Sequence, residues 1–126
     1  MIETPDSEER IPDPSRDGPF RSDVLYVGDH AVVVARGELD LAGAPALLRE
    51  ILGTLALPIG GVTVDLAYVT FLDSSGVHTL MQARTHALER GISFRLESVP
   101  DQARQVLETC DLLGLFGLTG GKTTTR

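Results

Sequence analysis

Residues 62–80 read VTVDLAYVTFLDSSGVHTL, and the change of pattern within this stretch decides the fold. Its first part, through Leu66, is a β-branched apolar run typical of a buried strand, and the apolar character continues to Leu72. From Asp73 onward an acid, two hydroxyls and a glycine precede apolar residues at helical spacing. This change predicts a helix that begins near Ser75. A strand that leads through a tight turn into a helix indicates an α/β protein.

The rest of the chain repeats this alternation. Residues 24–27 and 31–40 are β-branched runs separated by Gly28 and Asp29, which predicts an opening hairpin. The segment GAPALLREILGTL, residues 43–55, has apolar side chains at helical spacing and predicts an amphipathic helix. A further strand is expected at residues 92–98, and a third helix after it. The order ββαβαβα predicts one α/β domain whose helices pack on a mixed, mostly parallel sheet.

The apolar spacing also predicts which side chains of the later helices face the core. In the second helix these are Val77, Leu80, Met81, Arg84 and Leu88, and the outer face has His78, Gln82, Thr85 and Glu89. In the third helix they are Ala103, Val106, Leu107 and Cys110. The last apolar segment, residues 112–118, is expected to form a helical turn, a terminal strand or both.

Composition limits the possible classes of function. The 126 residues carry a formal net charge of −7, which argues against a nucleic-acid footprint. No apolar run approaches the roughly 20 residues that cross a bilayer, and the acidic N-terminus is not a signal peptide, so we expect a cytoplasmic protein without membrane insertion. The single Cys110 has no disulfide partner, and no zinc site is recognisable. Residues 1–22 are expected to be a disordered acidic tail, 23–118 the folded domain, and 119–126 a flexible tail.

Two interpretations of the Asp73–Gly76 turn remain open at this point. In the structural one, Asp73 or Ser74 caps the helix, and Gly76 allows a close approach of the chain. In the functional one, the unpaired N–H groups and the helix dipole accommodate a phosphate carried on Ser74 or Ser75. Such a phosphate would bring about −1.5 to −2 charges to an acidic protein, and it could repel a partner that accepts the bare hydroxyl.

Three segments together resemble the STAS-domain family of anti-sigma factor antagonists. They are ARGELDLAGAPALL, VTVDLAYVTFLDSSGV and VLETCDLLGLFGL, in this order and at these separations. The resemblance runs from about residue 24 to residue 118. It implies that Ser74, the first serine of D-S-S-G, is phosphorylated by an anti-sigma factor that is itself a serine kinase. Asp73, Ser75 and Gly76 then surround the acceptor.

The resemblance also implies partners and a partner surface. Gly37, Glu38 and Asp40 belong to the G-E-L-D segment, whose acid would lie near the acceptor and help contact the kinase. A serine phosphatase would reverse the modification. The chain is expected to need no cofactor, since ATP and magnesium would belong to the kinase, and to have no enzymatic activity. His78 stands where the family commonly has glycine, and it either continues the polar face of the helix or touches the phosphate.

Three other functions have some support in the sequence. Ser74, His78 and Asp40 suggest a hydrolase triad, but the G-x-S-x-G nucleophile elbow is absent. The C-terminal GGKTTTR resembles a phosphate-binding loop, but that motif would need glycine where Phe116 stands. The remaining alternative is a STAS scaffold or regulatory subunit of a signalling or transport complex, whose serines are never phosphorylated.

Overall fold

The computed structural model describes residues 19–118, and in these the strands and helices follow the predicted order. The elements are β1 (Arg21–Val27), β2 (His30–Leu39), α2 (Ala44–Leu55), β3 (Gly61–Leu72), α3 (Ser74–Glu89), β4 (Ser93–Glu97) and α4 (Asp101–Thr109). The sheet has the order β1-β2-β3-β4, in which β1 and β2 are antiparallel and the other two pairs are parallel. The prediction of a single α/β domain with a mixed, mostly parallel sheet is therefore confirmed.

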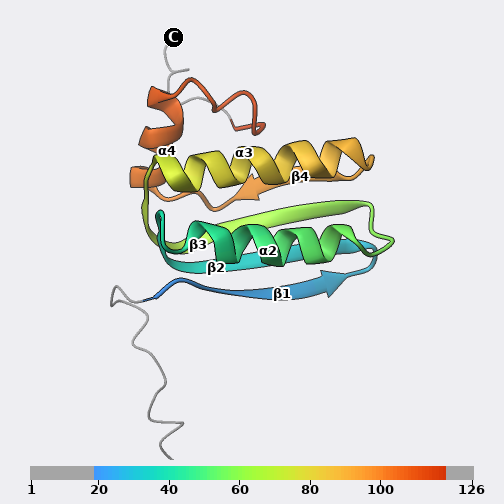
Figure 1. Ribbon diagram of the computed structural model, residues 1–126. Helices are drawn as coiled ribbons and strands as arrows, with labels where there is room; N and C mark the ends of the chain where they lie inside the picture. Colours follow the sequence, from blue (N-terminus) through green and yellow to red (C-terminus); the bar gives the residue numbers. More distant parts are fainter. Residues whose placement is uncertain (1–18, 119–126) are drawn as a thin grey trace, which may run out of the picture.

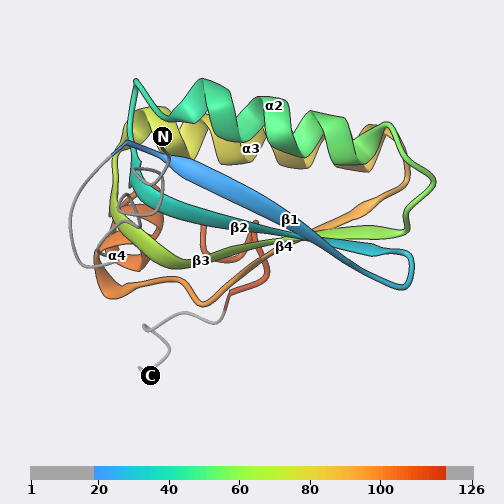
Figure 2. The ribbon, with the colours of Figure 1, turned by 90° about the horizontal axis from the view of Figure 1, so that it is seen from below.

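The helices α2 and α3 lie side by side and cover one face of the sheet (Figures 1 and 2). Under them the parallel strands β2 and β3 pair Ala31 with Val62 and Val33 with Val64, and all four residues are fully buried. From α2 the core receives Leu47 and Ile51, which are also fully buried. This apolar layer lies between the parallel strands and the helices that connect them. The alternation of strand and helix patterns along the sequence predicted such a layer.

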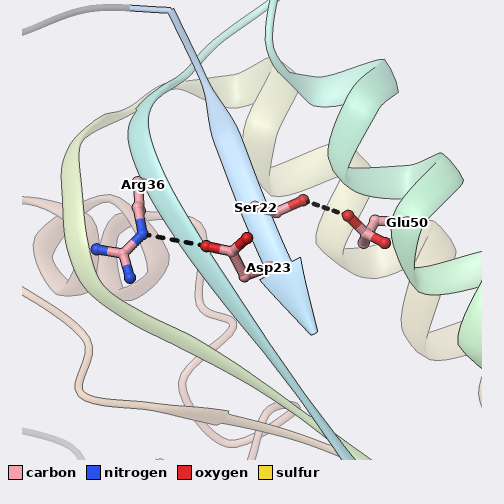
Figure 3. A network of polar contacts seen from close by, with 4 residues as sticks. All are labelled: Ser22, Asp23, Arg36 and Glu50. Carbon is pink, nitrogen blue, oxygen red and sulfur yellow. Dashed lines mark hydrogen bonds and ion pairs between the residues drawn. The ribbon is translucent and has the colours of Figure 1, made fainter. Parts of the chain in front are cut away.

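The edge strand β1 shows how side chains alternate between the two faces of the sheet. Ser22 donates a hydrogen bond of 2.9 Å from Oγ to Oε1 of Glu50 on α2. The next residue, Asp23, points the other way and pairs with Arg36 of β2, with 3.6 Å between Oδ2 and Nε (Figure 3). The guanidinium of Arg36 also lies over the ring of Tyr68, 4.6 Å from its centroid. These contacts tie β1 to α2 on one face and to β2 on the other.

The buried face of α3 differs from the prediction. Met81 and Leu88, expected in the core, are 36% and 48% exposed. The residues that α3 buries are mostly small: Gly76, Val77, Thr79, Leu80, Ala83 and Ala87. Around the helix axis they are rotated by roughly a quarter turn from the predicted face. α3 packs on α2 as well as on the sheet. Small buried side chains allow the close approach of packed elements, and the two larger ones lie on the exposed side.

The prediction that Cys110 packs in the core is wrong. It directly follows the end of α4 and is exposed. The core at this end is filled by Leu107 and, after the chain turns, by Leu113 and Phe116. Phe116 makes a tilted contact with Phe94 of β4, with ring centroids 6.3 Å apart. Because α4 ends at Thr109, Cys110 does not continue its buried face, and the core is completed by residues after the turn.

The segment after α4 forms turns, and within residues 112–118 there is neither helix nor strand. At the other end, β1 begins at Arg21, two residues before the expected start of the domain at residue 23. The expected tails lie almost wholly outside the described residues, so their disorder stays a prediction.

Candidate functional site

The turn between β3 and α3 is closed by the carboxylate of Asp73. Its Oδ1 accepts hydrogen bonds from the backbone N–H groups of Ser75 and Gly76, at 2.9 and 3.2 Å. Its backbone is extended, with φ −121° and ψ −171°, as is usual for a residue that caps a helix. Asp73 therefore satisfies two donors that the first turn of α3 would otherwise leave without partners. Of the two caps that the sequence offered, the helix uses Asp73 and not Ser74.

Ser74 is consequently free of any capping role. It is the first residue of α3 and is exposed, whereas Ser75 is half-buried and Gly76 is buried. Among residues 19–118, no hydrogen-bond partner is found for the Ser74 hydroxyl. The hydroxyl thus lies at the positive end of the helix dipole, open to an approaching group.

The turn between β2 and α2 has the same construction. Oδ1 of Asp40 accepts hydrogen bonds from the backbone N–H groups of Ala42 and Gly43, at 3.1 and 3.0 Å. Both turns therefore have the sequence Asp-x-x-Gly, in which the aspartate bonds the second and third residues after it. This recurrence is visible in the sequence as two Asp-x-x-Gly segments, each after a strand.

The parallel register brings the two turns together at one edge of the sheet. Leu39 pairs with Leu72, so Asp40 and Asp73 each follow the last residue of neighbouring strands. The backbone N–H of Asp73 donates to the carbonyl oxygen of Leu39 at 3.4 Å. A Cβ on Gly76 would lie 2.5 Å from that same oxygen, so only glycine fits here. The turn that carries Ser74 is therefore packed directly on the end of β2.

The other predicted site residues lie around this edge. Gly37 has φ +97°, which favours glycine, at a shift in the β2–β3 register. Glu38 pairs with Phe71 and is half-buried. His78 is exposed one helical turn after Ser74, as expected of the outer face. Its side chain makes no hydrogen bond within the described part of the chain. The predicted site residues thus lie around one edge of the sheet.

Two features of this edge were missed. Leu41 lies in the Asp40 turn, between Asp40 and Ala42. Its exposed fraction is 76%, which is unusually high for a large apolar side chain. The amide of Gln102 on α4 bonds the backbone of Leu72, just before the Asp73 turn. The exposed leucine could have been suspected from its place in a turn. The Gln102 contact spans 30 residues, and no local signal indicates it.

Within residues 19–118, no group of three or more His, Cys, Asp or Glu side chains could hold an ion. In the same part of the chain, every helix is too short or too polar to cross a membrane.

Comparisons with known proteins agree with this fold. A family model described as "Mlab, STAS domain" matches residues 24–119. A crystal structure of an anti-sigma factor antagonist from Mycobacterium paratuberculosis is similar with a TM-score of 0.73 and 25% identity, over 87% of this chain and 97% of that one. The anti-sigma factor antagonist SpoIIAA in its unphosphorylated form gives 0.68 and 16%, over 82% and 92%. A sulfate transporter family protein from Wolinella succinogenes gives 0.60 and 16%, over 74% and 75%. At 16% identity, the last two similarities are evidence for the fold alone.

Proposed function

Since the chain belongs to the STAS domain family, we propose that it is an anti-sigma factor antagonist controlled by phosphorylation at Ser74. Unphosphorylated, it binds an anti-sigma factor with serine kinase activity, and a sigma factor is released. The kinase transfers the γ-phosphoryl group of ATP to Ser74 Oγ, the hydroxyl loses its proton, and ADP leaves. A serine phosphatase restores the free hydroxyl. In this proposal the chain is a binding module that brings no cofactor of its own.

The observation that carries the proposal is the division of roles between Asp73 and Ser74. Because Asp73 caps α3, the exposed hydroxyl of Ser74 has no structural task among the described residues. A phosphate on Ser74 Oγ therefore breaks no hydrogen bond of the domain. The similarity to an anti-sigma factor antagonist at 25% identity, over 87% of the chain, supports the class of partner.

Electrostatics supports an on–off effect of the phosphate. It would add about −1.5 to −2 charges next to two turns that already begin with carboxylates, Asp40 and Asp73. A partner docked on this edge would meet the new charge and lose packing around the hydroxyl. A tenfold to thousandfold loss of affinity requires only about 1.4 to 4 kcal/mol. A switch of this size needs no change of fold.

The surface proposed for the partner consists of the Asp40 turn, the Asp73 turn and the exposed start of α3. Glu38, Asp40 and Asp73 supply negative charge, and Leu41 supplies an apolar side chain that is 76% exposed. Gly37 and Gly76 shape the backbone under this surface, and Ser75 flanks the acceptor. His78, one turn beyond Ser74, lies where it would meet either the partner or the phosphate.

The test begins with identification of the partner. Tagged wild-type protein and Ser74→Asp are used to capture proteins from the native cell, and we expect a kinase-type anti-sigma factor with the wild type only. The purified partner is then incubated with ATP, magnesium and each variant, and phosphate incorporation is measured by intact mass. Wild type should gain one phosphate and lose co-elution with the partner, whereas Ser74→Ala should gain none.

Ser75 provides the matched control, because it is the neighbouring serine of the same turn. Ser75→Ala should still be phosphorylated and should still be released from the partner. Phosphate on Ser75 in place of Ser74, or equal partner binding by Ser74→Ala and Ser74→Asp, would refute the switch.

The similarity in fold to a sulfate transporter family protein suggests one alternative function, that of a regulatory subunit. A regulatory STAS subunit of a transport or signalling complex would have the same fold and an unmodified Ser74. In that case the captured partner would lack kinase activity, and Ser74→Asp would bind it as tightly as the wild type.

A further inference from the structure

The last residue of β3, Leu72, is held on its outer side by a side chain from α4. β4 pairs with β3 only from Gly61 to Asp65, so within the described residues no strand borders the second half of β3 on this side. At Leu72 the side-chain amide of Gln102 takes that place. Its Nε2 donates to Leu72 O, and its Oε1 accepts from Leu72 N, both at 2.9 Å. One amide thus reproduces the pair of bonds that a facing strand residue would make.

The same stretch of β3 is fixed on its inner side by β2. The backbone N–H of Asp73 donates to Leu39 O, and the side chain of Leu72 is only 1% exposed. Leu72 and Asp73 are therefore held from both neighbours just before Ser74. Because Asp73 is also the cap of α3, its position sets the direction in which the helix starts.

The position of Gln102 is in turn fixed by the packing of α4. The residue lies in the first turn of this helix, which buries Ala103 and Leu107 in the core, 1% and 0% exposed. In Figures 1 and 2, α4 lies at the end of the sheet where β3 ends, and it packs against β3. A continuous set of contacts therefore runs from the core through α4 and Gln102 to Leu72, and from there along the backbone to Ser74.

We infer that Gln102 is a positioning residue for Ser74: its amide fixes the end of β3, and thereby the place at which the acceptor hydroxyl is presented to the kinase. The effect on phosphorylation rests on the proposed function. The effect on the turn is a property of this chain alone and can be measured without a partner.

The first experiment measures backbone hydrogen exchange by NMR in Gln102→Leu. The amide of Leu72 loses its acceptor, so its exchange should become about tenfold faster or more, and the amides of Ser75 and Gly76 should follow. Gln105→Leu is the matched control, because Gln105 is exposed on the same helix. It should leave all three amides unchanged. Equal exchange in both variants would overturn the inference.

A second substitution covers the case in which Gln102→Leu does not fold. Gln102→Glu keeps an acceptor for the Leu72 N–H but replaces the donor to Leu72 O with a carboxylate oxygen. It should accelerate exchange at Ser75 and Gly76, whereas Gln105→Glu should not. Unchanged exchange at these two amides in Gln102→Glu would also count against the inference.

The second experiment uses the kinase identified with the wild-type protein. For Gln102→Leu we expect kcat/KM for Ser74 phosphorylation to fall about tenfold or more, mainly through kcat, because a misplaced hydroxyl reacts slowly even when bound. An unchanged kcat would overturn the role in phosphorylation. If even the wild type is not phosphorylated by any captured partner, the proposed function fails, and the exchange measurement alone decides whether Gln102 holds the turn.

Discussion

The aspartates that follow β2 and β3 each stabilise a turn through one carboxylate oxygen. Asp73→Ala should lower the free energy of unfolding by about 1 kcal/mol, within the roughly 0.5–2 kcal/mol range of helix caps. Asp40→Ala should cost about as much, because two backbone N–H groups of the turn before α2 lose their acceptor. Asparagine keeps an Oδ1 acceptor, so Asp40→Asn and Asp73→Asn should stay close to the wild type. Urea unfolding followed by circular dichroism measures the difference. Equal losses for alanine and asparagine would show that the charge, and not the acceptor, holds the turns.

The same residues show what could be predicted at this scale. Asp73 as a possible cap followed from local chemistry, because its carboxylate bonds the N–H groups two and three residues later. For Gly76 the sequence predicted a close approach of the chain but not its partner, Leu39 of the neighbouring strand. For Asp40 the family resemblance implied a contact with the kinase, while the structure shows its Oδ1 bonded to Ala42 and Gly43. Asp40→Asn separates the two roles: it should keep the turn, and it should weaken partner binding only if the partner meets the charge.

At the scale of elements, the connection of α3 to β2 depends on a glycine inside a helix. Exposed helical glycine is about 0.5–1 kcal/mol less favourable than alanine, so Gly53→Ala in α2, where a Cβ meets nothing within 4 Å, should stabilise the protein by about that amount. Gly76→Ala should instead destabilise it by about 1–3 kcal/mol, because its Cβ would lie 2.5 Å from Leu39 O. Thermal unfolding of both variants measures whether stability rises for Gly53→Ala and falls for Gly76→Ala. A stabilising Gly76→Ala would contradict the close packing.

The elements also show where prediction from the sequence stops. Their order and type were predicted because each has its own apolar period. The orientation of α3 was predicted wrongly because the predicted face followed the spacing of the large apolar side chains, whereas the face that is buried has small ones such as Ala83 and Ala87. Likewise, Cys110 could be assigned to the core only as long as the later packing of Leu113 and Phe116 was unknown. Both errors concern contacts between elements. The spacing of apolar residues within one element does not determine these contacts.

For the whole molecule, the parallel sheet explains why two separate segments of the candidate site lie at one edge. The carboxyl ends of neighbouring parallel strands lie at one edge, so the segments G-E-L-D and D-S-S-G, far apart in the chain, meet once the topology is known. The topology of the sheet does not predict the contact between Gln102 and Leu72, because a side chain of α4 makes it and not a neighbouring strand.

The proposed switch also makes a prediction for the domain as a whole, since a charge at Ser74 should change binding without unfolding. Ser74→Asp should shift the thermal midpoint by less than about 4 °C, because exposed substitutions change stability by about 0.5 kcal/mol or less. Ser93→Asp, at the opposite end of the sheet, adds the same charge to the same acidic protein. Calorimetric titration with the partner should show weakened binding for Ser74→Asp alone.

Salt separates the electrostatic part of the lost affinity from the part due to packing, and Ser93→Asp separates a local charge effect from one of net charge. The Debye length falls from about 10 Å at 0.1 M to about 3 Å at 1 M, so part of the affinity that Ser74→Asp loses should return at high salt. The remaining loss measures the packing around the hydroxyl, which salt does not restore. If Ser93→Asp weakened binding as strongly as Ser74→Asp, net charge rather than the Ser74 turn would control the partner, and a local switch would be excluded.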